Sequence, residues 1–196
     1  MKVKIGIFDS GIGGFSILTS LLKTRKDVEV FYLADTQRVP YGNKEIKQIR
    51  SIAMEICNWF KDKNLDALLI ACNTTNACAL DILENNLQIP CFDLINSVSE
   101  TVTKEYIGVL ATSATIKSSF YQKTIESKRE KVKVFQQECP EFVSSFPMIT
   151  TPALNRYPVT IGYHSGFSDN KICSVTAYMD TTHKIFFWVS TFTAGS

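Results

Sequence analysis

The chain has 196 residues, 45% of them hydrophobic and 20% charged, which is enough for a sizeable core in one or two domains. The net charge of +2 argues against a strongly basic nucleic-acid or membrane-surface patch. The apolar run after Met1 ends at Asp9, too early for a secretory signal or a membrane span. We therefore expect a cytoplasmic protein whose six cysteines are reduced. A zinc site is not expected, because there is no Cys-x-x-Cys pair and there are only two histidines.

Apolar runs alternate with helical segments as far as about residue 140, the pattern of a strand–helix alternation. The clearest helix is predicted over 44–61, with an apolar face made of Ile46, Ile49, Ile52, Ile56, Trp59 and Phe60. Another is predicted over 113–130, with a buried side made of Ile116, Phe120 and Ile125. Six runs rich in Val and Ile are typical of buried parallel strands: 2–9, 28–35, 65–72, 89–95, 107–111 and 132–136. The alternation predicts an α/β fold with an open parallel sheet and right-handed crossovers.

The composition changes near residue 144. Residues 146–196 contain no Glu, no Gln and one Leu, whereas residues 1–145 contain twelve Leu. This tail is rich in Thr, Ser and aromatic residues, so one interpretation is a β-rich appendage. The other interpretation is that the tail was never selected to fold with the first part of the chain.

Small polar residues follow four of the predicted strands, where ligands bind in open α/β sheets. Gly11–Gly14 either offers backbone N–H groups to an anion or simply forms a tight turn, and it matches neither the dinucleotide nor the phosphate-loop pattern. Cys72 lies at a strand-to-helix junction, where a helix N-terminus favours the thiolate; the alternative is an inert buried thiol. Asp9 ends a buried run and needs either a functional partner or a helix to cap. The remaining cysteines before residue 140 fit structural positions: Cys57, Cys78, Cys91 and Cys139.

Together these segments resemble the glutamate racemases of the aspartate/glutamate racemase superfamily. The resemblance covers about residues 3–143 and rests on Phe8–Gly14, Asp35 with Pro40–Gly42, Ala71–Ala77, Gly108–Thr112 and Cys139–Val143. It implies two pseudo-symmetric domains, each with an open parallel sheet, and an active site between them. On this pattern residues 1–97 form an incomplete first domain, residues 98–143 begin the second, and residues 144–196 are an atypical tail.

The resemblance also implies a reaction, the interconversion of L- and D-glutamate for peptidoglycan synthesis without a metal or pyridoxal phosphate. One cysteine thiolate removes the α-proton and a thiol on the opposite face returns one. Cys72 matches the first catalytic cysteine and Asp9 the aspartate beside it. The expected partner is glutamate, with no nucleic acid or membrane, and a homodimer is left open. The positions that match substrate-holding residues are Ser10, Pro40, Tyr41, Gly42, Asn73, Thr74 and Thr112.

The sequence departs from the family in its last quarter. The second catalytic cysteine lies in Gly-Cys-Thr-His-Tyr-Pro-Leu, a string that does not occur here, and the surroundings of Cys173 do not match it. The family's acidic residue shortly after the Cys139–Val143 segment is also missing. One hypothesis is that the tail is racemase sequence read out of frame, in which case a single shift must lie after Met148. We therefore expect a truncated, impaired racemase; the alternatives are a non-catalytic glutamate-binding remnant and an aspartate-specific racemase of the same superfamily.

Overall fold

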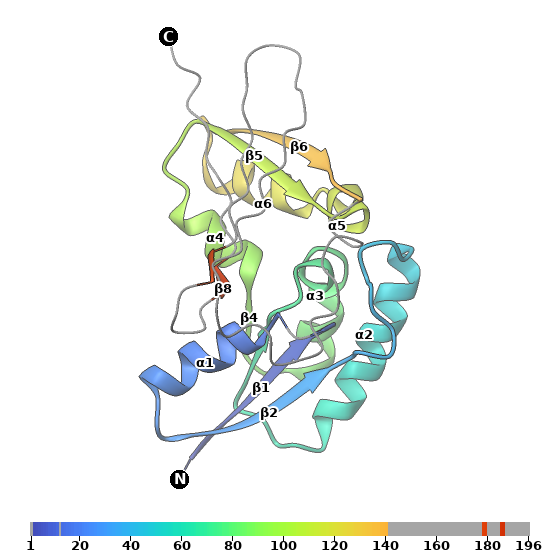
Figure 1. The fold of residues 1–196 in the computed structure, drawn as a ribbon, viewed down its shortest axis with the longest axis vertical. Helices are drawn as coiled ribbons and strands as arrows, with labels where there is room; N and C mark the ends of the chain where they lie inside the picture. Colours follow the sequence, from blue (N-terminus) through green and yellow to red (C-terminus); the bar gives the residue numbers. More distant parts are fainter. Residues whose placement is uncertain (1, 12, 141–177, 180–184, 187–196) are drawn as a thin grey trace.

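A computed structural model describes residues 2–11, 13–140, 178–179 and 185–186 of the chain. Four parallel strands form one sheet in the order β2-β1-β3-β4, and two further parallel strands, β5 and β6, form a second sheet. Figure 1 shows these two sheets at opposite ends of residues 2–140, with α3 and α4 between them. The strands are β1 (Val3–Asp9), β2 (Val28–Ala34), β3 (Ala67–Ile70), β4 (Cys91–Asp93), β5 (Tyr106–Ala111) and β6 (Lys133–Glu138).

Helices connect successive parallel strands, as crossovers between parallel strands require. In the first sheet α2 and α3 pack against each other on one face, and α1 lies on the other (Figure 1). A short antiparallel pair, β7 (Tyr178–Met179) and β8 (Ile185–Phe186), forms a separate two-stranded sheet. The helices are α1 (Phe15–Thr24), α2 (Ile46–Lys61), α3 (Asn73–Leu87), α4 (Leu94–Thr101), α5 (Ser113–Ser118) and α6 (Phe120–Lys128). The predicted α/β class with parallel sheets is confirmed.

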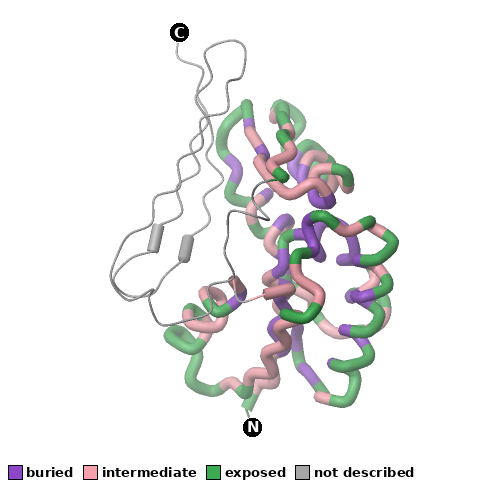
Figure 2. Tube along the Cα trace, turned by 45° about the vertical axis from the view of Figure 1, so that its right-hand side comes forward, coloured by how far each residue is buried: buried purple, intermediate pink, exposed green. Residues whose placement is uncertain are grey.

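The core lies between the sheets and the helices that cover them, as the buried segments in Figure 2 show. Phe8 of β1, Phe60 of α2 and Leu83 of α3 are all fully buried. Gly6 of β1 lies so close to the Leu65, Leu68 and Phe60 side chains that a Cβ there would come within 2.5 Å of Leu65 Cδ1. Because Gly6 has no side chain, the Leu65, Leu68 and Phe60 side chains can pack directly against the backbone of β1.

Two details of the predicted helices are wrong. The sequence predicts Trp59 on the apolar face of α2, but Trp59 is 40% exposed, with Lys63 Nζ 4.8 Å from its ring centroid. Phe60 takes the buried position because it follows Ile56 by four residues, which leaves Trp59 at the edge of the face. The helix predicted over 113–130 is split at Ser119, whose φ of 55° ends α5 and begins α6. Of its predicted buried side, Ile125 is fully buried and Ile116 and Phe120 are partly buried against the core.

The predicted strand over 89–95 is shorter than expected because Asp93 begins a helix. Its Oδ1 accepts a hydrogen bond from the backbone N–H of Asn96 at 2.7 Å, and so caps α4. The division of the chain at residues 97 and 143 stays a prediction, although β4 and β5 do lie in different sheets. No helix in the described part of the chain is both long enough and apolar enough to cross a membrane.

Candidate functional site

The carboxyl ends of the first sheet bring three chemically active side chains to one edge. β1 lies between β2 and β3, with Asp9 opposite Ala34 and Phe8 opposite Ile70. Asp9 therefore ends beside Asp35, whose backbone N–H donates to Asp9 O at 3.1 Å, and beside the segment leading to Cys72. Parallel strands that alternate with helices give this convergence directly.

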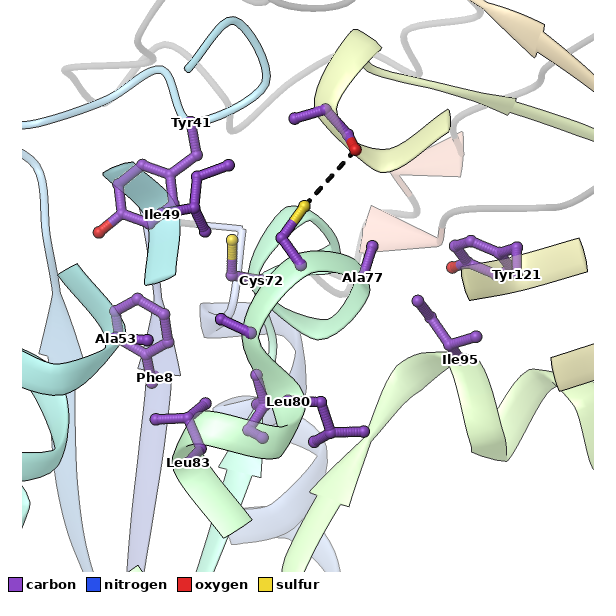
Figure 3. Packing of buried hydrophobic residues seen from close by; sticks show 14 of the residues in the cluster. Phe8, Tyr41, Ile49, Ala53, Cys72, Ala77, Leu80, Leu83, Ile95 and Tyr121 are labelled. Carbon is purple, nitrogen blue, oxygen red and sulfur yellow. Dashed lines mark hydrogen bonds between the residues drawn. The ribbon is translucent and has the colours of Figure 1, made fainter. Parts of the chain in front are cut away.

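Cys72 follows β3 and is the N-cap residue of α3. Its side chain is 4% exposed, and its Sγ donates a hydrogen bond to Ser10 Oγ at 3.3 Å. Ser10 comes directly after β1, so this bond joins the ends of two neighbouring strands. Figure 3 shows Cys72 at the start of α3, with Tyr41 on one side and Tyr121 on the other.

Burial is the largest influence on the Cys72 thiol and raises its pKa. The negative charge of Asp9 raises it further, while the Ser10 hydroxyl and the side chain and backbone N–H of Thr75 lower it. The expectation that the helix N-terminus favours a thiolate is thus outweighed by desolvation. In this arrangement Cys72 holds its proton at neutral pH, the form required of a proton donor.

Asp9 is 7% exposed, and its Oδ2 accepts the backbone N–H of Gly14 at 2.9 Å. Gly14 is the N-cap of α1, so the carboxylate anchors the start of that helix. A Cβ at Gly14 would come within 2.8 Å of Tyr32 Oη and 3.0 Å of Asp9 Cβ, which accounts for glycine here. Asp9 therefore caps a helix, as one interpretation of the sequence held, and also acts electrostatically on Cys72.

The segment after β2 places Pro40, Tyr41 and Gly42 close to the same edge. The Val39–Pro40 peptide is cis, and the Tyr41 side chain is 2% exposed. Tyr41 donates its hydroxyl to Asp35 Oδ2, which also accepts from Arg38 Nε at 2.6 Å. Burial, followed by the hydrogen bond to Asp35, raises the pKa of Tyr41, and the charge of a Cys72 thiolate raises it too.

Residues of α3 meet the second sheet's helices through hydroxyl and amide groups. Thr74 Oγ1 and Thr112 Oγ1 are 3.3 Å apart, and Thr112 Oγ1 lies 3.1 Å from Thr115 Oγ1. The Tyr121 hydroxyl of α6 donates to Asn73 Oδ1 at 2.7 Å. The first turn of α3 therefore carries polar side chains toward both α5 and α6.

The structure links most of the site residues predicted from sequence, in three groups. Ser10, Asp9 and Cys72 interact directly, and Thr74 contacts Thr112, while Pro40, Tyr41 and Gly42 share one loop. Tyr121 and its bond to Asn73 were missed, because no spacing in the sequence points from α6 to α3. In the described ranges no group of three His, Cys, Asp or Glu residues is placed to hold a metal ion. Cys173 lies outside the described residues.

The chain is similar in sequence and in structure to several glutamate racemases. No protein-family model matches the chain. It is 46% identical to a glutamate racemase of Prochlorococcus marinus (strain NATL2A) over 176 residues, which cover 88% of this chain and 65% of that protein. The structure matches a Francisella tularensis glutamate racemase solved with D-glutamate, at 36% identity and a TM-score of 0.70, over 73% of this chain and 55% of that one. The Aquifex pyrophilus glutamate racemase matches at 37% identity and a TM-score of 0.66, over 72% of this chain and 57% of its own.

These alignments also bear on the extent of the similarity. Residues 1–143 are 143 of 196 residues, or 73%, so an alignment that covers 88% of the chain continues past residue 143. This is further than the motifs alone indicate, and it is consistent with any single frame shift lying after Met148. The chain spans less than two thirds of the length of these relatives. On the identity of its sequence and the match of its fold, the chain belongs to the glutamate racemase family.

Proposed function

We propose that this protein acts on glutamate as the glutamate racemases do, with Cys72 as the group that transfers a proton at the α-carbon. The observation that carries the proposal is the buried Cys72 thiol at the carboxyl edge of the sheet, bonded to Ser10 and facing the charge of Asp9. Its support from the relatives is the shared name and the D-glutamate bound to the Francisella protein. The wider role proposed is supply of D-glutamate for peptidoglycan synthesis.

Proton transfer at this site needs the thiol in two forms. As the thiolate, Cys72 Sγ takes the α-proton, leaving the electron pair of the C–H bond on the α-carbon, whose carbanion is flat. As the thiol, it returns a proton to the same face. The Ser10 and Thr75 donors stabilise the thiolate against the opposing effects of burial and Asp9. A raised pKa makes the thiolate scarce but strongly basic, which suits removal of a weakly acidic proton.

The surrounding polar groups suit an amino acid with two carboxylates. Asn73, Thr74 and Thr112 offer amide and hydroxyl donors on the α3 side of Cys72, and such donors bind carboxylates well. Tyr41 lies on the other side of Cys72 (Figure 3), in the loop with Pro40 and Gly42, and is held by Asp35. We assign the first group to hold a substrate carboxylate and the loop to shape the site around the α-carbon.

Inversion of the α-carbon requires a second acid on the face opposite Cys72. The family's second-cysteine string is not found in residues 1–196. We therefore propose that the polypeptide of these residues exchanges the α-proton of one glutamate enantiomer and converts little of it to the other.

One experiment measures α-proton exchange and inversion of the α-carbon together. Purified polypeptide is incubated with L- or D-glutamate in deuterium oxide, and α-deuteration and enantiomer content are measured. We expect deuteration of one enantiomer with little inversion, and Cys72→Ser to reduce it by about 100-fold or more. Cys91→Ser is the matched control, because the Cys91 thiol lies on β4 away from these contacts.

Other outcomes would contradict parts of the proposal. Rapid inversion of both enantiomers would exclude the one-sided site, and unchanged exchange in Cys72→Ser would exclude Cys72 as the proton carrier. Faster exchange of aspartate than glutamate would indicate the aspartate-specific alternative. Saturable glutamate binding without deuteration would indicate a binding protein that does no chemistry.

A further inference from the structure

Tyr121 reaches the candidate site from a helix of the second sheet. It lies on α6, its side chain is 6% exposed, and its hydroxyl donates to Asn73 Oδ1 at 2.7 Å. Asn73 is the first residue of α3, directly after Cys72, and its side chain is exposed. A buried phenol therefore holds one end of an exposed amide next to the candidate proton carrier.

The direction of this hydrogen bond fixes which end of the amide is left for a ligand. An asparagine side chain has one acceptor oxygen and one NH₂ donor. Tyr121 occupies the oxygen, and within the described residues the Asn73 Nδ2 group has no hydrogen-bond partner. Burial raises the pKa of Tyr121, and the charge of Asp93 raises it further, so the phenol remains a donor at every physiological pH.

We propose that Tyr121 is a positioning residue: by donating to Asn73 Oδ1 it turns the Asn73 NH₂ group toward the site, where it donates to a carboxylate of the bound amino acid. This inference rests on the proposed function, because it assumes that the ligand is an amino acid held beside Cys72. Without the phenol, the amide is free to rotate by half a turn and present its oxygen to the carboxylate, which repels it.

A purely structural role for Tyr121 makes a different prediction. Tyr121 packs in the core with Ile125 and Ile95, so its removal could simply loosen α6. A loosened helix would lower the active fraction and hence the maximal exchange rate, at an unchanged half-saturating glutamate concentration. Loss of orientation would instead raise the half-saturating concentration and leave the maximal rate nearly unchanged, since it removes binding common to ground and transition states.

The experiment is a double-mutant cycle read by α-proton exchange. Tyr121→Phe keeps the ring and removes only the hydroxyl, and Asn73→Ala removes its partner. We expect Tyr121→Phe to raise the half-saturating concentration of the exchanged enantiomer about fivefold, the effect of one hydrogen bond. In the Asn73→Ala background the same change should have no effect. Tyr106→Phe is the matched control, because Tyr106 lies on β5 and is 47% exposed.

A second measurement needs no substitution in the core. D-glutamate is titrated into the unsubstituted protein while the side-chain NH₂ resonances of Asn73, identified by their loss in Asn73→Ala, are followed by NMR. We expect them to shift along with saturation of the site. Resonances that stay in place at saturation would overturn the inference, even if Tyr121→Phe does not fold.

The outcomes separate the two proposals. If the unsubstituted protein binds glutamate or exchanges its α-proton, and Tyr121→Phe has the same half-saturating concentration, the positioning role is wrong. In that case the proposed function stands. The same holds if Tyr121→Phe is equally damaging with and without Asn73. If the unsubstituted protein neither binds nor exchanges glutamate, the proposed function fails and the positioning role falls with it.

Discussion

At the scale of single residues, the behaviour of Cys72 is set by opposing neighbours. Desolvation and the Asp9 carboxylate favour the thiol, whereas Ser10 and Thr75 favour the thiolate. Asp9 is itself fixed by the N–H of Gly14, so its charge stays at a constant place relative to the sulfur. Two substitutions on neighbouring sides of the thiol should therefore shift its titration in opposite directions.

We expect Asp9→Asn to lower the pKa of Cys72 and Ser10→Ala to raise it. Asparagine keeps an oxygen for the Gly14 N–H but removes the charge that opposes ionisation, whereas alanine removes a donor that stabilises the thiolate. The check is the pH dependence of Cys72 alkylation by iodoacetamide, read by peptide mass spectrometry. Shifts in the same direction in both variants would show that general loosening of the site, not these contacts, sets the pKa.

Part of this site could be predicted from sequence, for a physical reason. Asp9 and Cys72 each follow a buried apolar run, and the ends of parallel strands share one edge, so their proximity follows from the fold class. The raised pKa could not be predicted, because it depends on how completely Cys72 is buried. The bond from Tyr121 could not be predicted either, because it depends on how α6 packs against α3.

At the scale of elements, the sequence predicted strands better than helix breaks. The strand over 28–35 differs from the observed β2, Val28–Ala34, by one residue, since a run of apolar β-formers leaves little choice. The break between α5 and α6 carries no Gly or Pro; it consists of Ser119 in a left-handed conformation. This conformation is unfavourable for a residue with a Cβ, and serine is not a residue type that indicates it. The break therefore could not be predicted from the local sequence.

The break yields a stability prediction. We expect Ser119→Gly to stabilise the fold by about 0.5 kcal/mol, because glycine adopts a positive φ without the Cβ clash, at some cost in unfolded-state entropy. Ser118→Gly is the control and should destabilise, because Ser118 is helical and its hydroxyl accepts the N–H of Phe120 at 3.2 Å. Urea denaturation measures both. Destabilisation by Ser119→Gly would mean that its side chain matters more than its backbone.

At the scale of the whole molecule, several thiols are buried or partly buried in the core, and the positive charges of Arg50 near Cys78 and Lys61 near Cys57 do not offset their desolvation. Burial is the largest of the effects that raise the pKa of Cys78 to about 12 and the pKa of Cys91 to about 11, from an ordinary value of 9.0. Cys57 and Cys72 shift the same way. The folded protein therefore retains thiol protons that the unfolded chain releases.

The consequence is a loss of stability in alkali. As the pH rises from about 9 toward about 11, the unfolded chain binds fewer protons than the folded one, so the free energy of unfolding falls. This contribution is fully present below the ordinary thiol pKa. Denaturation at a series of pH values measures it, and the slope should be smaller in Cys91→Ala, which lacks one of these thiols. If the free energy of unfolding falls equally steeply with pH in both proteins, groups other than the Cys91 thiol cause the loss of stability in alkali.

One of the contacts between the two sheets' helices and loops is made by the peptide groups of Ala114, the second residue of α5. Its N–H donates to Gly42 O at 3.0 Å, and its carbonyl accepts from Cys78 Sγ at 3.5 Å, the bond drawn as a dashed line in Figure 3. One residue of the second sheet's helices is thus tied both to the loop after β2 and to α3. Because its amide hydrogen is bonded to Gly42 O, it exchanges with solvent only when this contact opens. The hydrogen-exchange rate at Ala114 therefore measures how often the first and second sheets' elements separate locally.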